Sequence, residues 1–341
     1  MNLLGLTYAQ FKNQFQARYN KGDFHAAALY RGFYRHSNFN LADISAFASN
    51  PRLQRQVQTD LIIQWPKVLR HIQQHGVIKL VLGLHDGLRI ETVVIPMANH
   101  ATICVSCQVG CRMGCRFCRT GYLGWYRNLA ADEIVAQVHL VKLHLGFRIR
   151  NVVFMGMGEP LDNFDQVVQA IQVLSDQRGL DIAQRHMTLS TVGLPDEIKK
   201  LGALNWPHLK LAVSLSAPHD HIRNQLMPIN LRFPMSVLKA ALIQYSLLRG
   251  QTIFIAYVLI KGVNDHPRHA AQLASFFEGL PVKLNLIPYN PNSASSFEAP
   301  DTGIVQRFHQ ALLDEQIFVR LRNPKGANIR AACGQLGGGT Q

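Results

Sequence analysis

The chain has 341 residues, of which 48% are hydrophobic, and its formal net charge is +14. This length and apolar content suffice for one large core with an accessory domain, and the positive charge favours a polyanionic partner. No apolar run reaches the roughly 18 residues of a membrane span, and the N-terminus lacks the charged region and cleavage site of a signal peptide, so we expect no membrane segment.

Residues 1–75 have mainly helical periodicity and are expected to form a small helical accessory domain. Phe11 and Phe15 lie four positions apart and would share one face of a helix. We expect this aromatic stripe to be core rather than a surface on which bases stack. Two further helical segments are predicted, at Phe24–Tyr34 and Leu53–Ile72.

Residues 76–100 are predicted to form a β-hairpin extension. Two β-rich runs, Val77–Leu84 and Leu88–Pro96, flank the pair Asp86-Gly87, which is a strong hairpin signal. Glu91 lies on the second run. From the residues alone, we expect its carboxylate to face solvent.

Residues 101–336 alternate β-rich and helical segments, which predicts an α/β core with a parallel sheet. The strand-like runs are Thr102–Val105, Asn151–Met155, Met187–Ser190, Leu209–Leu215, Thr252–Ile260 and Val282–Ile287, and the helices include Ala131–Leu145 and Phe164–Leu174. Six such units are fewer than the eight of a closed barrel. Functional loops are expected after the carboxyl ends of the strands. The glycine-rich residues 337–341 are predicted to be a disordered tail.

Five of the six cysteines lie in the segment CVSCQVGCRMGCRFC, from Cys104 to Cys118. Only Cys111, Cys115 and Cys118 have the spacing C-x3-C-x2-C. Three thiolates on so short a loop can hold an iron–sulfur cluster and leave one iron open for a substrate or cofactor. Clustered cysteines in a chain without an export signal also favour a reducing, cytoplasmic compartment.

Two other uses of these cysteines remain open. Cys104 and Cys107, together with Cys115 and Cys118, form two C-x2-C pairs that could hold zinc. The seven residues between the pairs are fewer than the roughly 15–20 of a zinc ribbon. Either pair could instead be a redox dithiol.

The cysteine trio, with Phe117 before its last member, resembles that of the radical S-adenosylmethionine (SAM) superfamily. The flanking motifs resemble the RlmN/Cfr family of RNA adenine methyltransferases and occur in the same order. They include Gln108-Val-Gly-Cys111, Gly156-Met-Gly-Glu159-Pro160, Leu226-Met-Pro-Ile-Asn230, Gly262-Val-Asn-Asp265 and Ala331-Ala-Cys-Gly-Gln-Leu336. The resemblance extends from about Glu91 to Leu336. It implies a partial (β/α)6 radical SAM barrel, and more weakly an RNA-handling role for the helical N-terminal domain.

The resemblance also implies cofactors and site residues. A [4Fe–4S] cluster would be bound by Cys111, Cys115 and Cys118, and two SAM molecules would be used per turnover. SAM contacts are implied at Gly158, Glu159, Ser190, Ser214, Leu215, Ser216 and Asn290. Cys333 would be the S-methylcysteine intermediate, Cys104 would resolve the RNA adduct through a transient disulfide with Cys333, and Glu91 would be the proton acceptor.

The implied reaction is methylation of an adenine carbon in RNA, at C2 rather than C8 because the Glu159-Pro160 pair favours RlmN-like members. The implied partners are large-subunit ribosomal RNA, with transfer RNA as a second candidate, and an electron donor such as flavodoxin; the chain would act as a monomer. Cys107 stands where the family has Ser, so it could compete for the cluster or resolve the adduct. Ser216 stands where many members have His. Two alternatives are a radical SAM enzyme with a non-RNA substrate and a structural Cys333, and a zinc-dependent RNA-binding module.

Overall fold

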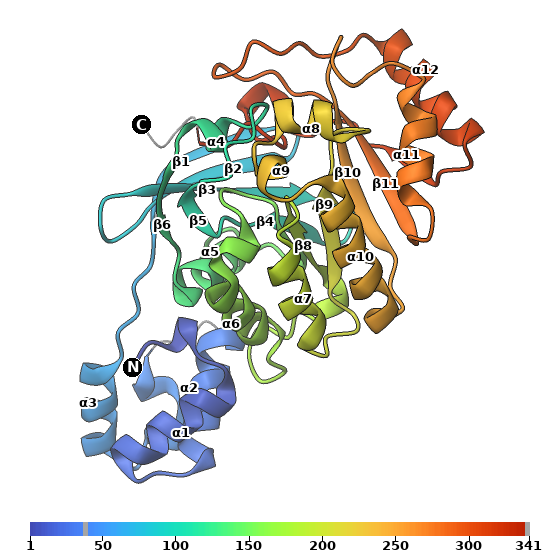
Figure 1. The fold of residues 1–341 in the computed structure, drawn as a ribbon. Coiled ribbons are helices and arrows are strands. Elements are labelled where there is room, and N and C mark those ends of the chain that lie inside the picture. Colours follow the sequence, from blue (N-terminus) through green and yellow to red (C-terminus); the bar gives the residue numbers. More distant parts are fainter. Residues whose placement is uncertain (37–39, 338–341) are drawn as a thin grey trace.

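The computed structural model describes residues 1–36 and 40–337. Within them, ten strands form one mixed sheet in the order β1-β2-β3-β4-β7-β8-β9-β10-β11-β12, and β5 and β6 form a separate pair. Helices cover the outer face of the large sheet, and a small helical unit packs below it (Figure 1). No helix in the described part of the chain is both long and apolar enough to cross a membrane.

The N-terminal unit consists of three helices and short 3-10 turns. They are η1 (Leu3–Gly5), α1 (Tyr8–Tyr19), α2 (Asp23–His36), η2 (Leu41–Asp43), η3 (Ser45–Phe47) and α3 (Pro51–Asp60). A capping box between Thr7 and Gln10 starts α1. Phe11 and Phe15 are fully buried, which confirms that the aromatic stripe is core.

The predicted helix at Leu53–Ile72 is wrong beyond Asp60, where α3 ends, and so is the helical assignment of residues 67–74. These residues form the strand β1 (Lys67–Gln74), which pairs antiparallel with β2 (Val77–Gly83). His75 and Gly76 both have positive φ and connect Gln74 to Val77 as a two-residue hairpin turn. The sheet pairing therefore overrides a weak helical pattern.

The predicted β-hairpin is confirmed by the antiparallel pairing of β2 with β3 (Arg89–Pro96). All six predicted core strands are also confirmed. They are β4 (Ala101–Cys104), β7 (Ile149–Phe154), β8 (Met187–Thr191), β9 (Lys210–Ser214), β10 (Ile253–Leu259) and β11 (Val282–Pro288). Each pairs parallel with the next, and a short seventh strand, β12 (Val319–Leu321), extends the parallel sheet.

The remaining elements connect and cover these strands. The short strands are β5 (Gln108–Gly110) and β6 (Trp125–Asn128). The helices are α4 (Arg119–Tyr122), α5 (Ala131–His144), α6 (Phe164–Ser175), α7 (Pro195–Ala203), α8 (Asp220–Leu226), α9 (Ile229–Arg232), α10 (Met235–Arg249), α11 (His269–Phe277) and α12 (Thr302–Asp314), with 3-10 turns η4 (Pro160–Asn163), η5 (Gln184–His186) and η6 (Ala327–Ile329). The helices predicted at Ala131–Leu145 and Phe164–Leu174 correspond to α5 and α6.

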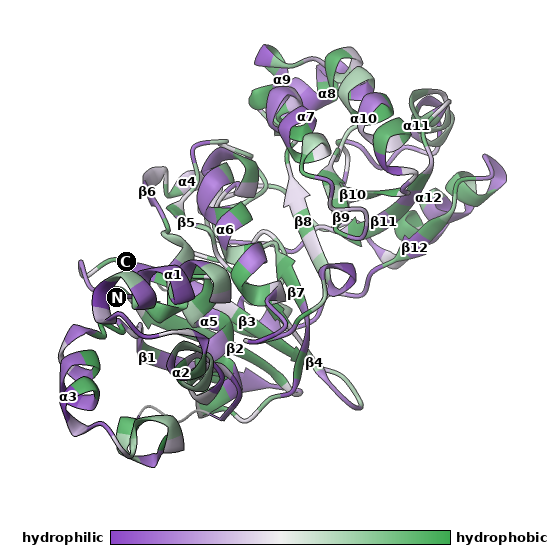
Figure 2. Ribbon diagram, turned by 90° about the horizontal axis from the view of Figure 1, so that it is seen from below, coloured by the Kyte–Doolittle hydropathy of each residue, from purple (hydrophilic) through white to green (hydrophobic). Residues whose placement is uncertain are grey.

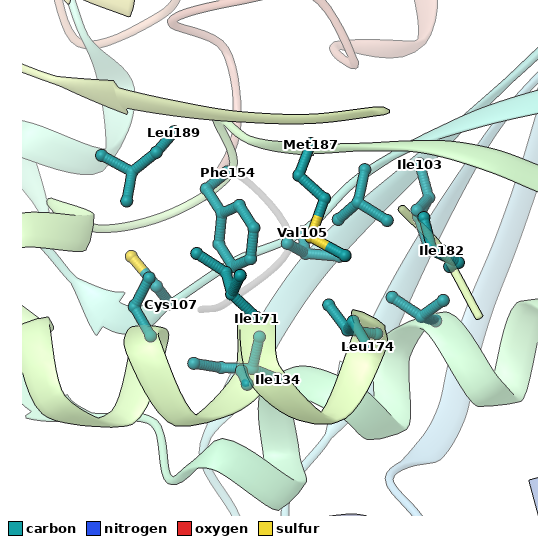
Figure 3. Packing of buried hydrophobic residues seen from close by; sticks show 14 of the residues in the cluster. Ile103, Val105, Cys107, Ile134, Phe154, Ile171, Leu174, Ile182, Met187 and Leu189 are labelled. Atoms are coloured by element: carbon teal, nitrogen blue, oxygen red, sulfur yellow. The ribbon is translucent and has the colours of Figure 1, made fainter. Parts of the chain in front are cut away.

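The main core lies between the sheet and these helices. Ile103 of β4 and Phe154 of β7 pack against Ile134 of α5 and Ile171 of α6 (Figure 3). Hydropathy follows the same division, since most sheet strands are hydrophobic while hydrophilic residues lie along the outer helices (Figure 2). This packing fixes the strand ends on which the candidate site is built.

Gly337 does not belong to a disordered tail, contrary to the prediction. Gly337 is buried and its backbone N–H donates to Glu91 Oε2 at 3.0 Å, because the chain end folds back over the β-hairpin. The rest of the predicted tail, residues 338–341, lies outside the described residues.

Candidate active site

The three spaced cysteines lie on one loop, residues 111–124, which we call the cluster loop. The pairing of β5 with β6 closes its base. Close approach at this base excludes side chains, because a Cβ on Gly110 would lie 1.9 Å from the carbonyl oxygen of Gly124. Inside the loop, a Cβ on Gly121 would lie 2.9 Å from the Cys115 carbonyl oxygen. The glycines thus allow the loop to fold tightly enough to bring its thiols together.

The thiols of the cluster loop share one small hydrophobic cluster. Cys115 is buried in it, and Cys111 and Cys118 pack against it. Burial raises the pKa of Cys111 to about 12 and raises the pKa of Cys115, and nearby cysteines of the same loop raise both further. Such mutual repulsion between thiolates is relieved by a bound cationic centre. Three shielded, neighbouring thiols therefore suit a [4Fe–4S] cluster with one open iron.

The two C-x2-C pairs do not form a zinc site. Cys104 ends β4 and Cys107 is buried in the main core, so neither belongs to the hydrophobic cluster around Cys115. The Cys107 thiol donates to the Met157 carbonyl oxygen at 3.6 Å and lies among hydrophobic side chains (Figure 3). In residues 1–36 and 40–337, no group of three or more His, Cys, Asp or Glu could hold a single metal ion. The Cys107 thiol is therefore part of the main core.

Cys333 lies on a C-terminal segment, residues 330–337, which we call the Cys333 loop. Five hydrogen bonds attach it to the cluster loop and to the segment after β11. They run from the Arg119 N–H to the Gly334 carbonyl (2.7 Å), from the Thr120 hydroxyl to the Leu336 carbonyl (2.8 Å), from the Asn290 amide to the Cys333 carbonyl (3.2 Å), from the Asn292 amide to the Gly334 carbonyl (3.5 Å) and from the Gln335 amide to the Pro291 carbonyl (2.9 Å). Segments more than 200 positions apart are thereby held together.

The Cys333 thiol lies near two other cysteines. Cys333 is solvent-exposed, yet the protein around the thiol raises its pKa, and the nearby Cys118 raises it further. Burial raises the pKa of Cys104, and Cys333 adds to that rise. All six cysteines are free thiols. Cys333 is therefore placed between the cluster loop and the carboxyl end of β4.

Glu91 is fully buried, so the expectation that it faces solvent is wrong. Its Oε1 lies 3.8 Å from Lys79 Nζ, and its Oε2 accepts the Gly337 N–H. Lys79 Nζ also donates to the Arg330 carbonyl at 3.2 Å. Burial lowers the pKa of Lys79, whereas Glu91 opposes that shift. The buried pair thus holds both ends of the Cys333 loop.

Lys79 was not identified from the sequence. The one sequence feature that points to it is the position of this lysine within the apolar run Val77–Gly83. In the observed register Lys79 is opposite Val93 and Glu91 is opposite Val81, so the two charged residues are diagonal neighbours on one sheet face. Only the pairing of β2 with β3 reveals this ion pair.

Glu159 follows β7 in a tight loop that packs against Gln108 of β5. Its oxygens accept the N–H groups of Val192 (2.8 Å) and Leu161 (3.0 Å). Burial raises the pKa of Glu159 to about 7, although these donors oppose the rise. Gly158 has φ +102°, and a Cβ there would lie 2.6 Å from Gln108 Cβ. The loop geometry therefore requires this glycine.

The other predicted SAM contacts differ in how deeply they are buried. Ser190 and Ser214 are half-buried near the carboxyl ends of β8 and β9. Asn290 is buried and bound to the Cys333 carbonyl. Leu215 and Ser216 are fully buried, and the Ser216 hydroxyl accepts the Val258 N–H at 3.3 Å. The hydrogen bond of Ser216 therefore stabilises the neighbouring strand.

Arg223 is a further residue that sequence analysis missed. It is fully buried on α8, and burial lowers its pKa to about 10. Its guanidinium donates to the carbonyls of Val192 (2.6 Å) and Ser214 (3.3 Å) and to the side chain of Asn230 (2.7 Å). Arg223 thus ties the ends of β8 and β9 to α8 and α9 beside the cluster loop.

Comparison with known proteins agrees with this geometry. The radical SAM superfamily profile matches residues 105–274. The chain is 38% identical to the probable dual-specificity RNA methyltransferase RlmN 1 of Protochlamydia amoebophila, over 99% of this chain and 94% of that protein. It is 42% identical to the dual-specificity RNA methyltransferase RlmN of Syntrophobacter fumaroxidans, over 92% and 91% of the two chains. The fold matches a radical SAM methyltransferase from Sphaerobacter thermophilus with a TM-score of 0.91 and 37% identity, covering 98% and 99% of the two chains.

Proposed function

The chain belongs to the RlmN family of radical SAM RNA methyltransferases, and from that premise we propose that it methylates C2 of an adenine through a methyl group carried on Cys333. Cys111, Cys115 and Cys118 would hold a [4Fe–4S] cluster, which together with SAM would supply a 5′-deoxyadenosyl radical. The observation that supports the proposal is the position of Cys333 near Cys104 and Cys118, in a loop that also contacts Glu91.

Cys333 serves as the methyl carrier. Its sulfur takes a methyl group from a first SAM and loses the thiol proton, which leaves S-adenosylhomocysteine. Transfer of one hydrogen atom from the S-methyl group to the radical from a second SAM, which becomes 5′-deoxyadenosine, would then give a carbon radical that adds to the adenine carbon. An electron-poor aromatic carbon is a poor nucleophile, so direct polar methyl transfer from SAM would fail there. The addition joins protein and RNA covalently.

Glu91 and Cys104 complete the transfer. Glu91 accepts the proton from the adenine carbon as the adduct radical gives one electron to a one-electron acceptor, a role that the oxidised iron–sulfur cluster would fill. Lys79 Nζ lies 3.8 Å from the Glu91 carboxylate and helps to hold it in place. The Cys104 thiolate then attacks the Cys333 sulfur, so that a disulfide forms as the carbon–sulfur bond to the RNA breaks. The electron pair left on carbon takes a proton to give the methyl group, and a dithiol reductant restores both thiols.

The proposed substrates are large-subunit ribosomal RNA and transfer RNA. The relatives' names include the words dual-specificity RNA methyltransferase, which supports more than one RNA substrate. A formal net charge of +14 suits a polyanion. We further propose a one-electron donor such as flavodoxin and a reducing, cytoplasmic compartment, where the free thiols would persist.

Peptide mass spectrometry of anaerobically purified protein, followed by nucleoside analysis of treated RNA, tests the proposal. We expect a methyl group on Cys333 and 2-methyladenosine in the RNA. Cys333→Ala should abolish both, whereas Cys107→Ala, which removes the core thiol, should retain both. An unmodified Cys333 in protein that holds its cluster and SAM would refute the methyl-carrier role. Formation of 8-methyladenosine would refute the C2 assignment alone.

A further inference from the structure

A second candidate site lies at the opposite end of the parallel strands from the cysteines. It is a cavity of about 580 Å³, which we call the basal cavity. Three of its lining residues stand directly before strands: His100 before β4, Arg148 before β7 and His186 before β8. The cluster loop and Glu159, in contrast, follow strands β4 and β7. The basal cavity is therefore distinct from the proposed methylation site.

The lining of the basal cavity is strongly basic. Lys142, Arg148, Arg150 and Arg185 line it, together with His100 and His186, against one acidic residue, Asp181. Arg148 and Arg150 are both exposed and both line the cavity. Asp181 lies 3.9 Å from Arg35 of the helical unit, which offsets part of its negative charge. The cavity thus has an excess of positive charge.

These positive groups repel one another in the free protein. Burial lowers the pKa of His186, and the neighbouring Arg150, Arg185, Lys210 and His100 lower it further. Burial likewise lowers the pKa of Lys142, with Arg35 adding to the effect. An anion in the cavity would relieve this repulsion, and arginine side chains are well suited to bind phosphate through paired hydrogen bonds.

We propose that the basal cavity binds backbone phosphates of the RNA substrate, at a distance from the adenine that is methylated. The assignment to RNA rests on the proposed function. Strand β7 has six residues, so the two sites are separated by roughly 20 Å of strand. A nucleic acid strand presents one phosphate about every 3.4 Å along a duplex, so a segment of about six nucleotides covers that distance. A small-molecule substrate could not occupy both sites.

The helical unit borders this cavity. Lys142 Nζ donates to the Tyr34 carbonyl at 2.8 Å, and the Arg35–Asp181 pair joins α2 to the loop before β8. The unit packs against α5 and α6 on the lower side of the core (Figure 1). The expected RNA-handling role of the N-terminal domain is thereby given a physical location, at its junction with the barrel.

The test is the salt dependence of RNA binding by the full chain. The double variant Arg148→Gln/Arg150→Gln removes two phosphate contacts. Each phosphate contact contributes about 0.7 to 0.9 to the magnitude of the slope of log K against log salt. The slope should therefore decrease in magnitude by about 1.4 to 1.8. The matched control, Lys199→Gln/Arg268→Gln, removes two exposed charges outside the cavity and should change the slope by much less. Equal changes in the two variants would overturn the proposal.

Two further measurements separate the alternatives. Titration with inorganic phosphate at constant ionic strength identifies a site for free phosphate. Phosphate binding that the double variant loses, with no change in the slope for RNA, would overturn the assignment to RNA. Methylation of Cys333 and cluster content need no RNA and should remain at wild-type level in the variant. If the wild-type protein lacks the methyl group on Cys333 or the cluster, the proposed function is contradicted. If Cys333 is methylated but the double variant has the same salt slope for RNA binding as the wild type, the basal site alone is contradicted.

Discussion

The buried pair of Lys79 and Glu91 offers a sharp test of the site. Lys79→Met removes the ammonium of a buried lysine that lies 3.8 Å from the fully buried Glu91 carboxylate, whose hydrogen bond from the Gly337 N–H is retained. Removing one member of a buried ion pair typically costs about 3–5 kcal/mol. The 3.8 Å separation and the retained hydrogen bond favour the lower end, about 3 kcal/mol.

A double variant distinguishes the effect of an unbalanced buried charge from the effect of a packing defect. Lys79→Met/Glu91→Gln removes the stranded charge while the Gln oxygen can still accept the Gly337 N–H. We therefore expect the double variant to recover most of the lost stability, which a cavity or packing defect at position 79 would not allow.

Urea denaturation of the apoprotein measures this difference. At a slope of about 3 kcal/mol per M, a loss of about 3 kcal/mol lowers the unfolding midpoint by about 1 M. Lys67→Met, at an exposed position of the same sheet, is the control and should change stability by less than about 0.5 kcal/mol. Equal midpoints for the single variant at position 79 and the double variant would refute the reasoning, because the Glu91 charge would then carry no penalty.

The remaining predictions concern the thiols and Glu159. Cys118→Ala should lose cluster iron by elemental analysis, and iron at the wild-type level would contradict the ligand assignment. Cys107→Ala should keep its iron and lose about 1 kcal/mol or more of stability, because it leaves a small cavity in the core; loss of iron would instead make it a ligand. Cys104→Ala should accumulate protein covalently bound to RNA, visible as a shifted band on a denaturing gel, and its absence would remove the resolving role. Since burial raises the pKa of Glu159 to about 7, binding of the SAM ammonium should favour the carboxylate and release a proton. SAM affinity, measured by calorimetry, should then fall as pH decreases below about 7, and Glu159→Gln should remove that dependence.

Much of the fold could be predicted from local sequence patterns. The six core strands are β-rich segments in which buried and partly buried positions mostly alternate, and Asp86-Gly87 marks the β2–β3 hairpin directly. Residues 67–74 were mispredicted because β1 is mostly exposed and lacks an apolar run. Its strand structure depends on pairing with β2, which no local pattern contains. The three-residue strand β12 was not predicted for the same reason, since its strand structure depends on pairing with β11.

The site could be predicted only where its residues lie in motifs. Family motifs identify the cluster cysteines and Cys333, but not what surrounds them. Lys79 and Arg223 sit in apolar or ordinary helical sequence, and their roles depend on strand register and on strand ends brought together by the barrel. The burial of Glu91 likewise depends on a chain end 246 positions away. Such partners are set by tertiary packing, which sequence spacing does not record.

The cysteines show why spacing alone misleads. Cys104 and Cys107 have the spacing of a metal-binding pair, yet β4 ends at Cys104 and the chain then turns. Cys104 is left partly exposed near Cys333, whereas Cys107 enters the core and bonds to Met157. Cys111, Cys115 and Cys118 belong to a separate group of packed hydrophobic side chains around the cluster loop. Burial and position, rather than spacing, therefore separate Cys107 in the core from Cys104 and Cys333 and from the three thiols of the cluster loop. The role that we propose for each thiol predicts a different outcome for the same substitution by alanine.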